Sequence, residues 1–195
     1  MIQVVLRNIA KCTAEQIQAV RVIRNQDGIR QSMYTEHEIE NDEHLCWVER
    51  LNSDTSQMVF VVLVDDVVSG VVSVDAVDRL HRKSDWAFYL DANVRGGLGA
   101  ALEYALLNYV FDEMHLEKLN CEVIETNEAV VKMHKKFGFL EEGFRRENIE
   151  KNGKRIGVFF LGLTKTDWAN CKQGVLKKYM AIFNKFEIRF EHDTL

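Results

Sequence analysis

A glycine-rich turn between a predicted strand and a predicted helix is the stretch of this chain best suited to bind an anion. Glycine occupies three of the four positions from 96 to 99, and an apolar, amphipathic helix follows. Bare backbone N–H groups and the positive end of a helix dipole together attract groups such as a diphosphate. Tight turns also use glycine for purely conformational reasons, so the motif alone leaves a structural role open.

Two polar side chains further along the chain could carry acid–base chemistry. Glu122 lies between apolar neighbours in the strand predicted at 118–124, and a carboxylate can accept a proton from an ammonium group. His134 lies in the helix predicted at 128–137, and an imidazole can donate a proton near neutral pH. A solvated strand glutamate and a packed histidine are the structural alternatives.

A third set of side chains could bind a second substrate. Arg24 carries the planar fork that binds two oxygens of a diphosphate, and aromatic rings nearby could stack on a sugar or a base. The set lies in the polar stretch 24–35 and in the helix predicted from about 38–42 to 51, and it comprises Arg24, Met33, Tyr34, His44 and Trp47. Core packing is the alternative for Met33 and Trp47.

Hydrophobic periodicity predicts a mixed α/β unit with one sheet, in which three consecutive strands form an antiparallel meander. We expect 25–35 to be a loop, Asn152-Gly153 to form a two-residue hairpin turn, and Asp75, Asp78 and Asp85 near strand ends to be solvated. The predicted order is strand 1–7, helix 13–25, helix 38–51 with Leu45, Val48 and Leu51 on its inner face, strands 58–64, 67–77 and 84–90, helix 98–114, strand 118–124, helix 128–137, and strands 139–149 and 156–163.

Length and composition limit the classes of protein to which this chain can belong. A chain of 195 residues is long enough for one packed core. The net charge of −5 argues against nucleic acid or an anionic membrane as the main partner. No run reaches the roughly 18 apolar residues of a membrane span, and no apolar N-terminal segment suggests export. We therefore expect a cytoplasmic protein whose four scattered cysteines are reduced and bind no metal.

Two motifs in combination are typical of one enzyme family. The glycine turn, the strand after its helix, and the stretch NEAVVKMHKKFGF at 127–139 occur in that order. Residues 1–164 thereby resemble the GNAT superfamily of acetyl-CoA-dependent N-acetyltransferases. The resemblance implies an α/β fold of the α+β type, with a splayed, mixed, mostly antiparallel sheet flanked by helices. Acetyl-CoA, the co-substrate, would lie where two neighbouring strands diverge.

The resemblance also assigns the cofactor contacts. A main-chain N–H around Tyr89 or Leu90 would polarise the thioester carbonyl. Asn127, which could equally be a plain helix cap, would contact the pantetheine arm. The pyrophosphate would rest on the backbone of Arg95, Gly96, Gly97, Leu98, Gly99 and Ala100.

The glycine turn departs from the family pattern of Gln or Arg, two residues, Gly, one residue, then Gly or Ala. Alignment on Gly97 and Gly99 puts Val94 in the Gln/Arg position, whereas alignment on Arg95 leaves the loop one residue short. Backbone amides carry such a site, so only a side-chain contact from Arg95 is put in doubt.

His134 stands where many family members carry a tyrosine that is assigned as the acid for the departing thiolate. The resemblance therefore implies that His134 donates a proton or hydrogen bond to the sulfur. Glu122 would be the base that takes a proton from the substrate ammonium, directly or through water.

Within the superfamily the chain looks most similar to N-acetyltransferases of nucleotide-linked amino sugars in the pseudaminic acid pathway. The implied acceptor is the 4-amino group of a UDP-linked amino-dideoxy sugar. The third set of side chains defined above would bind it. The runs that carry this narrower resemblance are Arg24-Asn25, Met33-Tyr34, His44 and Trp47, Cys121 to Val123, His134 to Phe139, and Lys151 to Lys154.

Other functions remain open at this stage. One is a GNAT enzyme that acts on a protein N-terminus or a polyamine, and another is a degenerate domain that only binds acyl-CoA. The predicted acetyltransferase domain spans 1–164, and 165–195 form a C-terminal extension with a helix at 168–184 and a short strand at 186–190. A homodimer is one candidate assembly.

Overall fold

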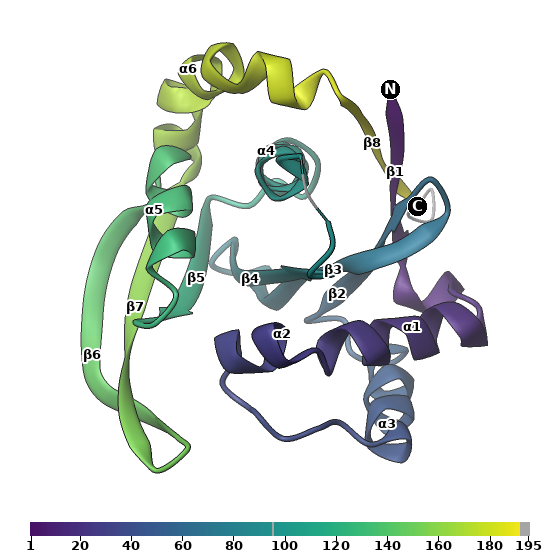
Figure 1. Cartoon of the computed structure of the whole chain (residues 1–195). Coiled ribbons are helices and arrows are strands. Elements are labelled where there is room, and N and C mark those ends of the chain that lie inside the picture. Colours follow the sequence, from purple (N-terminus) through teal and green to yellow (C-terminus); the bar gives the residue numbers. More distant parts are fainter. Residues whose placement is uncertain (95, 192–195) are drawn as a thin grey trace.

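One eight-stranded sheet runs through the chain in the computed structural model, which describes residues 1–94 and 96–191 (Figure 1). The strand order across the sheet is β6-β7-β5-β4-β3-β2-β1-β8. The strands are β1 (Ile2–Asn8), β2 (Met58–Val64), β3 (Val67–Asp78), β4 (Lys83–Leu90), β5 (Lys118–Ile124), β6 (Leu140–Lys151), β7 (Lys154–Thr164) and β8 (Phe186–Glu191).

Helices cover both faces of this sheet (Figure 1). They are α1 (Ala14–Arg24), α2 (Asp27–Ser32), α3 (Asn41–Leu51), α4 (Leu98–Asn108) with a π-helical continuation η2 (Tyr109–Glu113), α5 (Glu128–Lys136) and α6 (Lys165–Phe183), besides a short 3-10 turn η1 (Ile9–Lys11). Thr13 begins α1 with the capping box that its sequence predicts, because its side chain accepts from the N–H of Gln16 and the Gln16 side chain accepts from the N–H of Thr13.

The alternation of strand side chains creates two separate cores. In β1, Val4 and Leu6 point to one face and Val5 to the other. The larger core lies under α4, α5 and α6, and the smaller one lies under α1 and α3 with Val20 and Val48 at its centre. Burial on both faces explains why β2 is apolar at every position.

The sheet opens between β4 and β5. These parallel strands pair at only three positions, and the last pair joins Asp85 to Asn120. Beyond it, β4 continues to pair with β3 and β5 continues to pair with β7. The edges of β4 after residue 85 and β5 after residue 120 therefore face a gap, which is the splayed sheet implied by the resemblance.

The predicted fold class is confirmed, with two local differences. Asn152 and Gly153 have φ of 50° and 71°, as the predicted hairpin turn requires. The stretch expected to be a loop contains α2, a helix of only six residues that is too short to show periodicity. The inner face of α3 carries His44 and Val48, whereas Leu45 is 48% exposed, so the prediction for Leu45 was wrong.

The C-terminal residues join the same sheet. Strand β8 pairs in parallel with the whole length of β1 from residue 2 to residue 7. Helix α6 packs on α4, where the indole N–H of Trp168 donates to Asn108 at 3.2 Å. The boundary at residue 164 stays a prediction. None of the described helices is long and apolar enough to cross a membrane.

Candidate active site

A cavity of about 260 Å³ lies where β4 and β5 separate. Its walls come from residues 86–90 of β4, 121–123 of β5, 28–33 in and after α2, and Asn127, Val130 and His134 around α5. Four of the predicted site residues besides those of β4 line it, namely Met33, Glu122, Asn127 and His134. Tyr34 does not line it but donates a hydrogen bond to Glu122. The gap in the sheet therefore gathers the predicted acid, the predicted base and part of the predicted acceptor set.

The glycine turn forms a backbone cradle at the start of α4. Gly96 and Gly97 have φ of 85° and 90°, which side-chain-bearing residues rarely adopt. Gly97 is the N-cap residue and makes no side-chain cap, so the N–H groups of Leu98, Gly99 and Ala100 point out of the first turn. Arg95 lies outside the described residues. These three amides and the helix dipole are suited to hold an anion.

Close packing behind the cradle restricts Gly97 further. A Cβ on Gly97 would lie 2.6 Å from Cγ2 of Ile182 in α6, which is closer than real contacts allow. On the other side, a Cβ on Gly99 would lie 3.5 Å from the ring of Phe88, an ordinary contact. The conformation of the turn is thus fixed by α6 as well as by β4.

Strand alternation selects Leu90 over Tyr89 as the source of the main-chain N–H in the cavity. The N–H of Asp91 donates to Ser69 of β3 at 2.8 Å. In an antiparallel pair, backbone groups point to the same neighbour at every second residue, so Tyr89 also points to β3 and Leu90 points away from it, toward the gap. The carbonyl oxygen of Tyr89 accordingly lies beside Gly70 of β3.

His134 is joined to a buried carboxylate that the sequence interpretation missed. Its Nδ1 lies 2.8 Å from Oε1 of Glu103 in α4, and the two side chains are 4% and 0% exposed. Burial raises the pKa of Glu103, and the nearby His134 opposes the rise. The available signal was a single carboxylate in the otherwise apolar run LGAALEYALL.

Glu122 points into the cavity, as the resemblance implied, and accepts a hydrogen bond from the hydroxyl of Tyr34. Burial and this hydrogen bond raise the pKa of the Tyr34 hydroxyl. Tyr34 thus stays a neutral donor that fixes the Glu122 carboxylate at the mouth of the cavity, next to Met33.

Asn127 occupies the N-cap position of α5 and lines the cavity. Its side chain makes no capping hydrogen bond, so the plain-cap interpretation does not describe it. Asn127 lines the cavity together with Val130, and its amide is not committed to the cap.

The rest of the predicted acceptor set lines a second cavity of about 300 Å³ on the α1 and α3 side of the sheet. Arg24, His44 and Trp47 lie in its wall, together with Arg50, which the sequence interpretation did not select. Tyr89 lines both cavities, so the two are neighbours across β4.

Arg24 has hydrogen-bonding capacity left for a ligand. Its Nη2 donates to the backbone oxygen and the hydroxyl of Thr35, whereas its buried Nη1 has no partner among the described residues. Burial lowers the pKa of this guanidinium. A buried cationic N–H without an acceptor is costly, so an anion in this cavity would satisfy it.

His44 has a structural contact of its own. Its Nε2 donates to the carbonyl of Ile17 at 2.9 Å, and burial lowers its pKa. Trp47 packs against this ring at 5.4 Å between centroids and remains partly exposed. Asp75, expected to be solvated, instead lines this cavity with a pKa raised by burial. The expectation failed because this carboxylate lies in the wall of a cavity, where burial removes it from water.

Side chains from distant segments hold the acceptor loop, defined here as residues 33–40. The buried ammonium of Lys151 donates to the carbonyls of Arg30 and Gln31 at 3.0 and 2.9 Å and to that of Met33. Asn152 donates twice to Glu36, once from its backbone and once from its side chain. The tip of the β6–β7 hairpin thereby fixes the end of α2 and the loop that follows.

Two residues of the α1–α2 junction tie the same region to its surroundings. The Asn25 amide pairs with both backbone groups of Ile39 at 2.9 Å. Gln26 donates to Asp91 at 2.6 Å and accepts from the N–H of Ala92 at 3.0 Å, so it links α2 to the segment that leads into the glycine turn.

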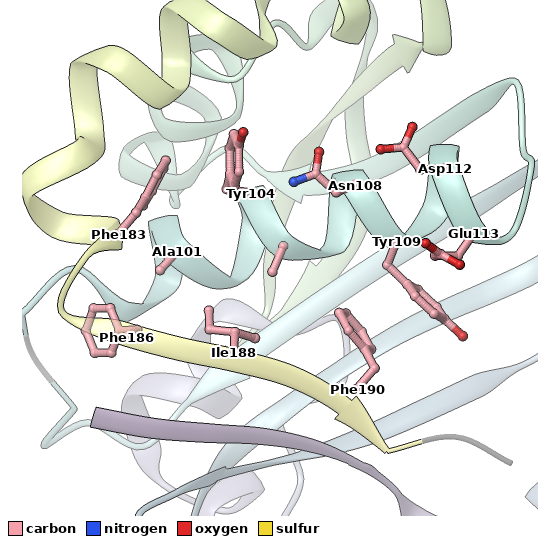
Figure 2. A pocket seen from close by; sticks show the side chains of 11 residues that line it. Ala101, Tyr104, Asn108, Tyr109, Asp112, Glu113, Phe183, Phe186, Ile188 and Phe190 are labelled. Atoms are coloured by element: carbon pink, nitrogen blue, oxygen red, sulfur yellow. The ribbon is translucent and has the colours of Figure 1, made fainter. Parts of the chain in front are cut away.

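A separate groove of about 620 Å³ lies between α4, η2, the end of α6 and β8 (Figure 2). Aromatic rings form much of its wall, and the rings of Tyr109 and Phe190 stack at 4.2 Å. Among the predicted site residues that the structure describes, none lines this groove. We therefore place the candidate active site at the cavity between β4 and β5 and its neighbour across β4.

Comparisons with known proteins show the family to which the chain belongs. The sequence model of the family described as "Acetyltransferase (GNAT) domain" matches residues 7–159. The chain is 26% identical over 134 residues to acetyltransferase PseH of Campylobacter jejuni, which covers 69% of this chain and 83% of the relative. It is also 28% identical over 102 residues to spermidine N(1)-acetyltransferase of Escherichia coli. This match covers 52% of the present chain and 55% of the relative.

A solved structure of similar fold is the spermidine N-acetyltransferase of Vibrio cholerae in complex with CoA and spermine. The TM-score is 0.78 at 22% identity, and the similarity covers 86% of this chain and 99% of the other.

Proposed function

This chain belongs to the GNAT family of N-acetyltransferases, and from that premise we propose that it transfers the acetyl group of acetyl-CoA to the 4-amino group of a UDP-linked amino-dideoxy sugar. The observation that carries the acceptor class is the cavity across β4, where two arginines and two aromatic rings come together. Arginine suits a diphosphate, and an aromatic ring can stack on a base. The sequence match to PseH, which covers 69% of this chain against 52% for the spermidine enzyme of Escherichia coli, supports the same class.

The cavity between β4 and β5 suits the thioester. The amides of Leu98, Gly99 and Ala100 would hold the pyrophosphate of CoA, and Asn127 would contact the pantetheine arm. The N–H of Leu90 would donate to the thioester oxygen and stabilise the negative charge that develops there. The family relation and the fit of these groups support acetyl-CoA as the co-substrate.

Transfer then needs two proton movements. Glu122 takes a proton from the acceptor nitrogen, so that the amine attacks the carbonyl carbon directly. As the carbon–sulfur bond breaks, His134 gives a proton to the thiolate, whose ordinary pKa near 8.5 means that it needs only modest help. Tyr34 keeps Glu122 at the cavity mouth, on the side from which the acceptor enters.

A polyamine is the second candidate acceptor. Glu43 and Asp75 line the same cavity as the arginines, and carboxylates bind ammonium groups. The spermidine acetyltransferases among the relatives support this alternative. The arginines disfavour it, because they would repel a polycation.

The deciding experiment measures CoA release from acetyl-CoA with a UDP-amino-sugar, spermidine, or a peptide with a free N-terminus. We expect turnover with the sugar nucleotide, and Arg24→Ala should raise the KM for it without changing acetyl-CoA binding. Arg79→Ala, an exposed arginine outside both cavities, is the matched control. Transfer to spermidine alone would replace the sugar with the polyamine, and CoA binding without transfer to any amine would leave a binding module.

A further inference from the structure

A buried pair of side chains, Glu103 of α4 and His134 of α5, lies beside the cavity. Glu103 is completely buried, and its neighbour His134 lines the cavity whereas Glu103 does not. Oε1 of Glu103 contacts Nδ1 of His134, whereas Oε2 has no hydrogen-bond partner among the described residues. The imidazole therefore connects the cavity on one side to a desolvated carboxylate on the other.

The surroundings leave Glu103 no other proton partner at hydrogen-bonding distance among the described residues. Rings surround His134: Trp86 and Phe88 of β4 and Phe139, whose centroids lie 5.1 to 6.5 Å from that of the imidazole. The titratable group facing Glu103 from β5 is the thiol of Cys121, whose pKa is raised by burial. The carboxylates of Asp85 and Glu122 lie further out, near that thiol.

We propose that Glu103 is the positioning residue for the leaving-group acid: it accepts the Nδ1–H of His134, so that Nε2 faces the cavity, and it enables the pair to hold the proton that the thiolate receives. This inference rests on the proposed acetyl transfer for its catalytic part. The orientation of the imidazole is independent of the acceptor.

Every proton that moves in this step has a named donor and a named acceptor. Before transfer, Glu103 and His134 together hold two protons, as a carboxylate with an imidazolium. When the carbon–sulfur bond breaks, the electron pair goes to sulfur and the Nε2 proton follows it. The pair is left as carboxylate with Nδ1-protonated imidazole and regains a proton from solvent, while Glu122 has taken the proton of the acceptor nitrogen.

Burial explains why the pair should hold this proton. An isolated buried carboxylate is costly, and the rise in the pKa of Glu103 expresses that cost. A proton anywhere on the pair removes the net charge. The same arrangement of a buried carboxylate on Nδ1 orients the catalytic histidine in serine proteases.

The test compares Glu103→Gln with the unaltered chain. The amide keeps the size of the side chain and can still accept from Nδ1, but it carries no charge. We expect kcat to fall about tenfold or more with the KM for acetyl-CoA nearly unchanged, and the alkaline limb of the kcat profile to move to lower pH. Lys132→Gln, an exposed position on α5, is the matched control.

A second measurement does not depend on activity or on the variant. In the unaltered protein, the ¹⁵N shifts of His134 should show a proton on Nδ1 and, in the neutral ring, none on Nε2. An Nε2–H tautomer in the neutral ring overturns the proposal, as does an unchanged pH profile in a folded Glu103→Gln protein. Because the ¹⁵N result needs no acceptor, it separates failure of this inference from failure of the proposed function.

Discussion

The two sides of the proposed active site are built in different ways. The cofactor side consists of backbone: the amides at 98–100, the N–H of Leu90 and two glycines with positive φ. The acceptor side consists of a loop, residues 33–40, held by Asn25, Lys151 and Asn152 from outside it. A backbone site can bind the same anion with many different sequences, whereas a site held by side chains changes when one of them is replaced.

This contrast explains how the two sides could evolve separately. Acetyl-CoA is common to the family, and its cradle needs only small residues and a helix start. Acceptors differ between relatives, and the acceptor loop depends on hydrogen bonds over more than 100 residues of sequence. Variants on each side should therefore alter different kinetic constants.

Glu122 lies where the two sides meet, and its replacement should have the largest effect. Glu122→Gln removes the base, so we expect kcat to fall about 100-fold and the acidic limb of the pH–rate profile to disappear. Tyr34→Phe is the matched variant, because it removes the donor and leaves the carboxylate in place. Its kcat should fall less. A Glu122→Gln protein with a full acidic limb would assign the base elsewhere.

The cradle should respond to backbone changes alone. Gly97→Val forces a strained φ and a contact with Ile182, so we expect the KM for acetyl-CoA to rise about tenfold and the acceptor KM to change little. Gly174→Ala in α6, where a Cβ meets nothing within 4 Å, is the control and should leave both constants unchanged. Equal losses in both KM values would contradict the separation of the two sides.

The hairpin tip should affect only the acceptor side. Lys151→Met removes three hydrogen bonds to the end of α2, so we expect the acceptor KM to rise about fivefold while the KM for acetyl-CoA stays the same. Lys154→Met, an exposed lysine of the same hairpin, controls for the loss of charge. If the acetyl-CoA constant rises instead, the loop also shapes the cofactor side.

The smallest effect should come from replacing His44, which we expect to change how the free energy of unfolding depends on pH. Because burial lowers its pKa, the unfolded chain takes up a proton near the ordinary value of 6.5 and the folded chain does so only at lower pH. The free energy of unfolding should therefore fall as the pH drops below that value. His44→Gln should reduce this fall, as measured by urea titrations at pH 7 and pH 5. An identical pH dependence would mean that His44 is protonated in the folded protein.

Local patterns were enough to predict most of the fold. Strand and helix periods located β2 to β5, and Gly97 marked the start of α4. The pattern of β5 left Glu122 facing either solvent or the cavity, and the family resemblance led us to expect both Glu122 and His134 in the cavity that they line. The assignment of their roles remains a prediction.

What could not be predicted depends on contacts distant in sequence. Glu103 meets His134 across 31 residues, and Lys151 meets the end of α2 across about 120. The expected single acceptor set is divided by β4, since Met33 and Arg24 lie on different cavities. No local pattern of hydrophobicity encodes which of two cavities a loop residue will reach.

The contact between Ile182 and Gly97 has a practical consequence for engineering. A shortened protein that ended at residue 164 would match the family model in length, yet it would lack the helix that backs the anion cradle and the strand that covers β1. Its β1 would become a free sheet edge, which tends to aggregate. Fusion partners and tags are therefore better placed after β8, and any transplant of this active site onto another scaffold should carry α6 with it.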